Sequence, residues 1–256
     1  MTVINPRVKR EDVFNVPDVE FTDTWHPIPH RTCIESVERV TDELNIKIDH
    51  DNELYSLSAD GHQMYAAWSL LNGDTKKIGN NTLFQCIIFR NATNKYFSFG
   101  INGGTNAYVC ENLVLFFEHF DEFRRHTGRL DNDELDRVIT KGVFEIVPKL
   151  SGIRVWHNAL HNIKLEEKDT KALAYDAIRE KIISQKRIPQ FNTLLFDSSH
   201  NDESHRYNPK ELYGFHGACT ELMNDMNMTG GFVEKQNRLH SFIVDRFEDR
   251  LPVIPR

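Results

Sequence analysis

Apolar residues near the start of the chain recur at helical intervals, at Ile34, Val37, Val40 and Leu44. Thr32 and Glu35 have the spacing of a capping box, in which each side chain satisfies a backbone N–H at the helix start. The pattern therefore predicts a helix over 32–45. Residues 1–24 show no periodicity, so we expect an irregular N-terminal arm there.

The middle of the chain is rich in alternating, aromatic and β-branched residues, a pattern typical of strands. The runs cover 46–50, 54–57, 64–71, 83–90, 95–101 and 107–117. Turn-forming residues separate them, and we interpret the Asn-Gly-Gly-Thr-Asn segment at 102–106 as a tight hairpin turn. Successive strands joined by short turns pair antiparallel, which predicts a meander of four to six strands.

Helical periodicity returns after residue 131, with a stripe formed by Leu135, Val138, Ile139, Val143, Ile146 and Val147. It predicts a helix over 132–147 that Pro148 interrupts, then further helical stretches over 153–160 and 169–185. Asn208 and Pro209 have the residue types of an N-cap and a first helical position. We expect them to open a helix, and a last helix to run to about residue 249.

These elements predict an α+β fold, with an N-terminal helix, an antiparallel β-meander and a helical C-terminal half packed on it. We expect the arm over 1–24 and a single domain over 25–256, with the meander over 46–117 and the helical part over 131–249. A chain of 256 residues buries a core without disulfides or metals. The four cysteines form no CxxC pair, so buried thiols are favoured over a zinc site.

No apolar run is long enough to cross a membrane, and the first residues lack the apolar segment of a signal peptide. We therefore expect a cytoplasmic protein with no membrane partner. The net charge of −7 is uneven: 11–60 hold thirteen acidic and three basic residues, whereas 61–190 hold eighteen basic and fifteen acidic residues. The acidic segment is a solubilising surface or an interface. The slightly basic body remains compatible with a polyanionic partner.

Candidate chemistry is sparse. His157 and His161 lie one helical turn apart, as in zinc-binding helices, but position 158 is asparagine rather than the general-base glutamate. We favour a packing role for the pair. The chain has no nucleophile-elbow, kinase or dinucleotide-binding motif, so we expect no catalytic residue, metal or cofactor.

Basic and aromatic residues interleave after the last predicted strand. Arg124, Arg125 and Arg129 would hold phosphates, and Phe120 or Phe123 would stack on bases, a combination suited to single-stranded DNA. Lys186 and Arg187 form a second candidate patch. The alternative is an aromatic core cluster with a solvated basic rim.

Four stretches resemble the phage- and plasmid-borne family known as domain of unknown function 932. They are Pro29-His30 before the first helix, Leu57 to Gly61, Phe99 through Asn112-Leu113 to His126-Thr127, and Leu212-Tyr213-Gly214 with Ala218, Thr220 and Glu221. Together they span about 25–247. The family's Arg-Asn-Ser-His segment is replaced here by Asn102-Gly103-Gly104-Thr105. The resemblance implies a mobile-element context.

The predicted element order also looks like the core of phage proteins that anneal single strands. Our leading hypothesis is a phage protein that binds or anneals single-stranded DNA in recombination, as a homo-oligomer. One alternative is a phage inhibitor that docks its acidic N-terminal surface on a host or defence protein. Another is an enzyme with an unrecognised site.

Overall fold

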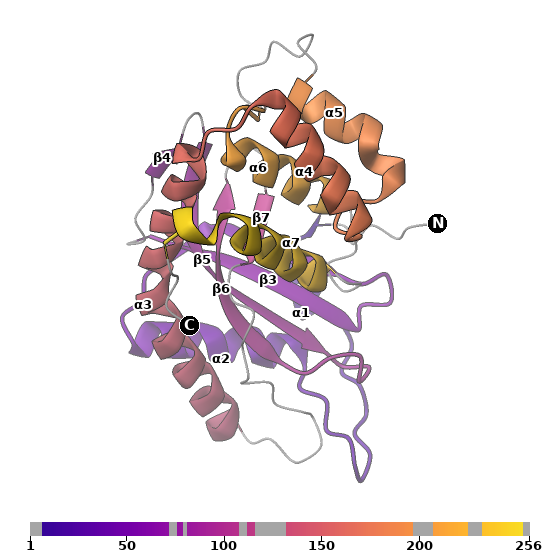
Figure 1. The fold of residues 1–256 in the computed structure, drawn as a ribbon. Coiled ribbons are helices and arrows are strands. Elements are labelled where there is room, and N and C mark those ends of the chain that lie inside the picture. Colours follow the sequence, from indigo (N-terminus) through magenta and orange to yellow (C-terminus); the bar gives the residue numbers. More distant parts are fainter. Residues whose placement is uncertain are drawn as a thin grey trace.

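The computed structural model describes residues 7–71, 76–78, 81–107, 112–115, 132–196, 207–224 and 232–252. Within them, α1 and α2 lie between the first two strands of an antiparallel sheet, and the other helices follow the last described strand (Figure 1). The fold class is therefore α+β, as predicted. Helices α4, α5 and α6 gather beyond one end of the sheet in Figure 1.

The described strands are β1 (Arg7–Val8), β2 (Ile48–Leu57), β3 (Gln63–Leu70), β4 (Lys76–Ile78), β5 (Asn81–Ala92), β6 (Gly100–Ala107) and β7 (Asn112–Leu115). These seven described strands form one sheet in the order β1-β2-β3-β5-β6-β7, and β4 pairs with β5 off this path. Every pairing is antiparallel. The predicted meander is confirmed.

Strand β2 merges the two short strands expected over 46–50 and 54–57. The register with β3 shifts between Asp49 and Glu53, so the polar residues between them form an irregularity inside one strand rather than a turn. On β3, Met64, Ala66 and Trp68 face one side and Tyr65 and Ala67 the other, and all five are buried. Both faces of the central sheet are therefore covered.

The Asn-Gly-Gly-Thr-Asn segment at 102–106 is not a turn, and the hairpin prediction is wrong. It lies inside β6, where Gly103 pairs with Ile87 and Gly104 pairs with Cys86 of β5. The apolar strand β5 pairs with this segment, and the turn-like composition of the segment gives no sign of that partner. Glycine within a strand permits close approach of another element, and α3 (Asn132–Asn162) contacts β6.

The first long helix is α2 (His30–Glu43), which confirms the predicted helix with ends two residues earlier. Its N-cap is Pro29, so Thr32 and Glu35 lie inside the helix and the predicted capping box is wrong. Its buried stripe includes Cys33, Ile34, Val37 and Val40. Cys86 and Cys219 are also buried free thiols.

The N-terminal arm is ordered where the sequence predicts irregular chain, so that prediction is wrong for residues 7–14. They form β1 and the short helix α1 (Arg10–Phe14). Val13 is buried in the core, and the Arg10 guanidinium lies 2.6 Å from a carboxylate oxygen of Glu38 on α2. One apolar anchor, the pairing of β1 with β2 and the ion pairs of Arg10 with Glu38 and Glu53 hold a segment too short to show periodicity.

Helix α3 runs unbroken through Pro148, contrary to the predicted interruption. A proline removes one backbone hydrogen bond from a helix. The buried stripe nevertheless continues on both sides of it, with Ile146 and Leu150 flanking the proline and Trp156 and Leu160 further on. Tertiary packing of this stripe outweighs the missing hydrogen bond.

The remaining helical elements are α4 (Glu167–Arg179), η1 (Gln185–Arg187), α5 (Ile188–Phe196), α6 (Leu212–Asn224), α7 (Phe232–Phe247) and η3 (Glu248–Arg250). Helix α4 ends six residues before the predicted 185, because Lys181 adopts a left-handed conformation with φ of 61°. Helix α5 was not predicted. Helix α6 begins at Leu212 rather than at Pro209, since Asn208 accepts a hydrogen bond from the Lys210 N–H in a separate turn.

Two backbone hydrogen bonds join the chain before α4 to the chain before α6. The Leu165 N–H donates to the Lys210 carbonyl, and the Leu212 N–H donates to the Ile163 carbonyl, each at 3.0 Å. Residues 166–209 therefore begin and end at the same place, where residues 163–165 pair with residues 210–212. Helices α4 and α5 pack on α6, and α6 and α7 contact β7.

Candidate nucleic-acid interface

The structure describes two of the seven residues predicted to bind nucleic acid. Lys186 and Arg187 lie in η1, where Lys186 is exposed and Arg187 is half-buried. Phe120, Phe123, Arg124, Arg125 and Arg129 lie outside the described residues, and their predicted roles stay predictions.

Lys235 on α7 interacts electrostatically with two cations, Arg187 from a distant part of the chain and Arg238 on the same helix. Burial lowers the pKa of the half-buried Lys235 ammonium, and the positive charges of Arg187 and Arg238 lower it further. We call Arg187, Lys235 and Arg238 the basic cluster. Glu234 lies 2.5 Å from the Arg238 guanidinium and is the acid that raises the pKa of Lys235.

The end of α4 brings Arg187 to this place. Lys181 in the left-handed conformation ends the helix, and the N–H groups of Ile182 and Ile183 return to the Ala177 carbonyl. Both isoleucines are buried, which anchors the turn and directs η1 along the protein surface. The Arg187 guanidinium also donates to the Gln190 amide oxygen at 3.3 Å.

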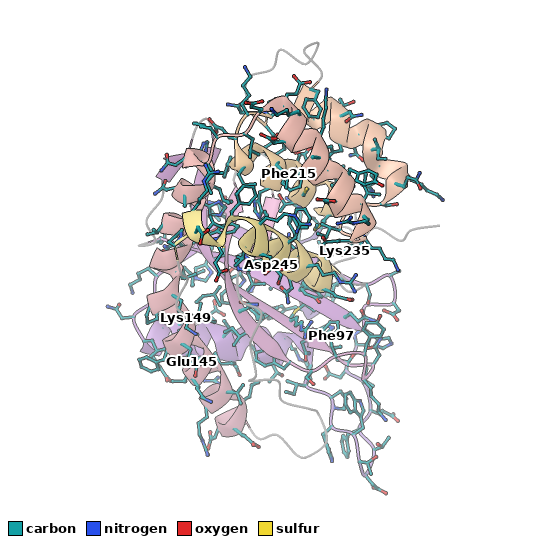
Figure 2. The ribbon with its side chains drawn as sticks, viewed as in Figure 1. Phe97, Glu145, Lys149, Phe215, Lys235 and Asp245 are labelled. Carbon is teal, nitrogen blue, oxygen red and sulfur yellow. The ribbon has the colours of Figure 1, made fainter. Side chains whose placement is uncertain are left out.

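Lys235 and Arg238 lie in the first two turns of α7, where the unpaired backbone N–H groups of a helix add partial positive charge. Figure 2 places Lys235 near one end of α7 and Asp245 near the other. The helix also carries Glu234 in its first turn and Arg246 in its last, so both signs of charge occur at each end.

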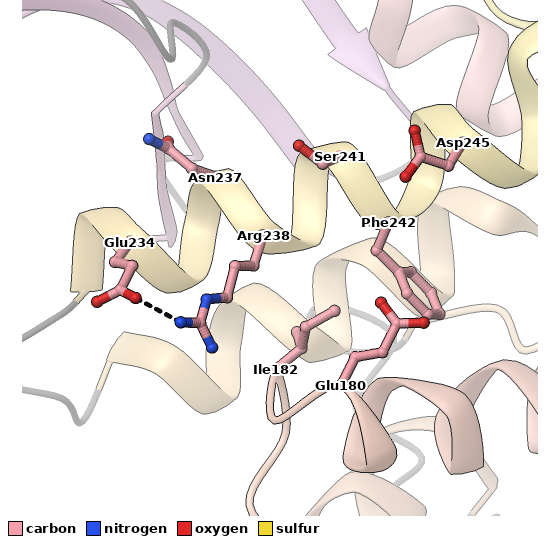
Figure 3. A pocket seen from close by; sticks show the side chains of 8 residues that line it. All are labelled: Glu180, Ile182, Glu234, Asn237, Arg238, Ser241, Phe242 and Asp245. Atoms are coloured by element: carbon pink, nitrogen blue, oxygen red, sulfur yellow. Dashed lines mark hydrogen bonds and ion pairs between the residues drawn. The ribbon is translucent and has the colours of Figure 1, made fainter.

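A hollow of about 500 Å³ lies between α7 and the turn after α4. Its lining residues are Glu180, Ile182, Glu234, Asn237, Arg238, Ser241, Phe242 and Asp245. Figure 3 shows Asn237, Ser241 and Asp245 along one side of α7, with Glu234 and Arg238 on the other and Glu180 and Ile182 opposite the helix. We call this the α7 hollow; it shares Arg238 with the basic cluster.

Some carboxylates that line the α7 hollow form ion pairs and others do not. The Glu180 carboxylate lies 2.7 Å from the Arg246 guanidinium, which also stacks over the Phe242 ring at 3.6 Å from its centroid. Asp245 is exposed and makes no ion pair among the described residues. It is therefore the carboxylate in this hollow with the most capacity to accept hydrogen bonds from a ligand.

The predicted histidine pair on α3 lies in the helical layer. His157 is buried, and burial lowers its pKa to about 3, with a smaller contribution from the charge of His161. Its ring lies 6.1 Å from that of His216 on α6, and the Trp156 ring lies 5.1 Å from that of His240 on α7. His157 thus packs at the junction of three helices, in agreement with the favoured interpretation.

His161 lies at the edge of the same layer. Its Nδ1 lies 2.7 Å from Glu211, whose other carboxylate oxygen lies 2.7 Å from the Lys164 ammonium, and its ring stacks on Tyr213 at 4.2 Å. Burial raises the pKa of Glu211, but the hydrogen bond from Lys164 and the charge of His161 outweigh it and lower the pKa overall. The arrangement fastens the start of α6 to the end of α3.

Among the residues that the structure describes, no three or more histidine, cysteine, aspartate or glutamate side chains are grouped to hold a metal ion. The basic cluster is the part of the site that sequence reasoning missed. Lys235 and Arg238 lie about fifty residues after Arg187, and neither belongs to a run of basic residues. Only the fold brings Arg187 within electrostatic reach of Lys235.

No helix in the described part of the chain is both long and apolar enough to span a membrane. Comparison with protein-family models, with curated proteins and with solved structures found no match.

Proposed function

We propose that this protein binds single-stranded DNA through the basic cluster. It would act as a homo-oligomeric, mobile-element protein in the cytoplasm of a host cell. The observation that supports the proposal is that Lys235 feels the positive charges of both Arg187, from a segment distant in the sequence, and Arg238 on its own helix. Lys186, next to Arg187 and exposed, extends the same positive surface.

Burial is the largest cause of the lowered pKa of Lys235, and repulsion by Arg187 and Arg238 lowers it further. A phosphate offsets this repulsion, because its negative charge attracts Arg187 and Lys235 and competes with Glu234 for Arg238. Single-stranded DNA offers phosphates in series, and binding releases the counterions condensed on them. Arg124, Arg125 and Arg129 would add phosphate contacts, and Phe120 or Phe123 would stack on bases.

The test is the salt dependence of binding. A fluorescent 20-nucleotide single strand is titrated with the full chain at several salt concentrations by fluorescence anisotropy. We expect affinity to fall steeply with salt. The Arg187→Ala, Lys235→Ala double variant should lower the slope of log K against log salt by about 0.7 for each phosphate that the protein no longer neutralises. Absence of binding at the lowest salt concentration would contradict the proposal.

Lys168→Ala with Lys171→Ala is the matched control. Both lysines are exposed on α4, where they lie 2.6 Å from Glu166 and Glu167. The control removes the same number of cations without touching the basic cluster, so it should leave the slope nearly unchanged. An equal loss of affinity in both double variants would mean that binding follows total charge rather than this site. Light scattering with and without DNA tests oligomerisation.

A second candidate function is docking on a host or defence protein through the acidic N-terminal surface. On α2, Glu35, Asp42 and Glu43 are exposed, whereas the basic side chains of Arg31 and Arg39 are paired with Asp18 and Asp136 at 2.5 and 2.7 Å. The outward charge of this helix is therefore negative. Glu35→Gln, Asp42→Asn and Glu43→Gln together should abolish capture of a stoichiometric protein partner while leaving DNA binding intact.

A further inference from the structure

We infer that Tyr96 is a base-stacking residue for single-stranded DNA and that Lys95 holds the adjacent phosphate. Both residues lie in the segment 93–99 that joins β5 to β6, which we call the hairpin tip. The inference rests on the proposed function and deepens it, because it names where a base of the bound strand lies.

Tyr96 is one of four strongly exposed aromatic side chains among the residues that the structure describes, and 65% of its surface is accessible. The other three are Phe21, Phe144 and Tyr175. Each of those three has a carboxylate next to it in the sequence, from Glu20, Glu145 and Asp176 respectively. A carboxylate repels the phosphates of a nucleic acid, whereas Tyr96 directly follows a lysine. Tyr96 is therefore the exposed ring with the sequence neighbour best suited to a nucleotide.

The chain around the hairpin tip contains no acidic residue. Residues 75–110 include no aspartate or glutamate, and their basic residues are Lys76, Lys77, Arg90 and Lys95. The Lys95 ammonium lies 5.2 Å from the centroid of the Trp25 ring and forms no ion pair among the described residues. A cation held against an aromatic ring keeps its charge. Lys95 therefore retains its capacity to pair with a phosphate.

Acidic residues occur in the two segments next to the hairpin tip, and neither segment neutralises Lys95. In the turn between β2 and β3, the Asp60 carboxylate accepts hydrogen bonds from the Ser58 hydroxyl and from the His62 N–H. Glu20 and Asp23 precede Trp25 in the sequence, and neither forms an ion pair with Lys95.

Contacts on both sides of Tyr96 hold the hairpin tip in place. The Tyr96 N–H donates to the Asn94 side-chain oxygen at 3.2 Å. The Phe97 ring packs edge-on against the buried Tyr65 ring, 5.5 Å between centroids, and the Arg90 guanidinium lies 4.9 Å from the Phe97 centroid. A ring presented by an ordered turn loses little conformational freedom when a base stacks on it.

An exposed ring beside a lysine selects single strands. The bases of a duplex already stack on one another, whereas a single strand presents free π-faces to aromatic side chains. Because Lys95 and Tyr96 are adjacent, one nucleotide can place its phosphate at the ammonium and its base on the ring.

The experiment compares the fluorescent single strand with an abasic strand of equal length, which keeps the phosphates and lacks the bases. Both are titrated by fluorescence anisotropy at the same salt concentration. We expect Tyr96→Ala to weaken binding of the normal strand by about tenfold and of the abasic strand by less than about twofold. The salt dependence should be unchanged, because tyrosine carries no charge. Tyr96→Phe keeps an aromatic ring and should restore wild-type affinity.

Tyr175→Ala is the matched control, because it removes an equally exposed tyrosine that lies beside Asp176. It should bind both strands as the wild type does. Equal loss of affinity for the normal and abasic strands in Tyr96→Ala, or no loss for either, would overturn the stacking role and leave DNA binding standing. No binding of the normal strand by the wild type would overturn the proposed function itself. Thermal unfolding verifies that each variant retains the fold.

Discussion

Asn91 and His30 form a hydrogen bond in the core that joins the centre of the sheet to the start of α2. The Asn91 amide nitrogen lies 3.0 Å from His30 Nδ1 and also donates to the Ile28 carbonyl at 2.8 Å. His30 Nε2 in turn lies 2.9 Å from the Gly61 carbonyl. One side chain of β5 thus fixes the entry to α2, and through His30 the turn between β2 and β3.

Replacing Asn91 should test how much this connection contributes. Asn91→Ala would leave His30 Nδ1 and the Ile28 carbonyl buried without their donor, and each such loss costs about 1–3 kcal/mol. We expect the free energy of unfolding, measured in urea, to fall by at least about 2 kcal/mol. Asn192→Ala, on the exposed side of α5, is the control and should change it by less than about 0.5 kcal/mol. Equal effects would mean that the His30–Asn91 connection contributes nothing specific.

Buried histidines make the stability of the fold sensitive to acid. Burial lowers the pKa of His30 to about 4 and that of His157 to about 3, and lowers the pKa of His216 well below its ordinary value. In the unfolded chain these groups titrate near a pH of about 6.5. The unfolded state therefore binds more protons below that pH, so stability is complete above about 6.5 and falls as pH falls toward about 4 and about 3.

Urea unfolding at pH 7.5 and pH 5.0 measures this loss. Each histidine should contribute about 2 kcal/mol of destabilisation at pH 5.0, a pH at which most carboxylates remain ionised. His157→Leu should lose about 2 kcal/mol less between the two pH values than the wild type, whatever its stability at pH 7.5. The same pH dependence in both proteins would exclude His157 as a contributor.

Two glycines on α6 allow the preceding segment to pack against the helix. A Cβ atom at Gly214 would lie 2.0 Å from the Asn208 carbonyl oxygen, and one at Gly217 would lie 2.2 Å from the Tyr207 ring. Gly214→Ala should destabilise by more than about 2 kcal/mol, because a backbone atom must move. Gly217→Ala should cost less, since the Tyr207 side chain can rotate. If both variants instead raise the melting temperature, as helix propensity alone predicts, these contacts are not important.

Lys181 offers a stabilising substitution. Its φ of 61° is unfavourable for a residue with a Cβ atom and costs glycine nothing. Lys181→Gly should therefore raise the free energy of unfolding by about 1 kcal/mol. Lys168→Gly inside α4 should lower it by a similar amount. A loss of stability in both would show that the Lys181 side chain is needed for packing.

The local pattern of apolar residues was sufficient to predict an element wherever that element buries one continuous apolar face. The spacing of Ile34, Val37 and Val40 predicts α2, and the alternating runs predict the meander. Local pattern failed where contact with another element determines the secondary structure. Gly103 and Gly104 have turn composition but pair with β5, and Pro148 lies within a helix that packing on both sides maintains.

The candidate site shows the same limit. Lys186 and Arg187 are visible in the sequence as a basic pair, but nothing local connects them with Lys235 and Arg238. Their association depends on the left-handed residue that ends α4 and on the position of α7. Both are tertiary features. Composition identifies the kind of residue, and the fold identifies which residues act together.

The pair of backbone hydrogen bonds that joins 163–165 to 210–212 gives the helical half a modular construction. Because residues 166–209 begin and end at one point, they have the geometry of an inserted segment, while α3 leads into α6 through the chain on either side. Arg187 belongs to that module, and Lys235 and Arg238 belong to the body that carries it. Sequence change confined to residues 166–209 can thus alter the charge beside Lys235 without disturbing the sheet.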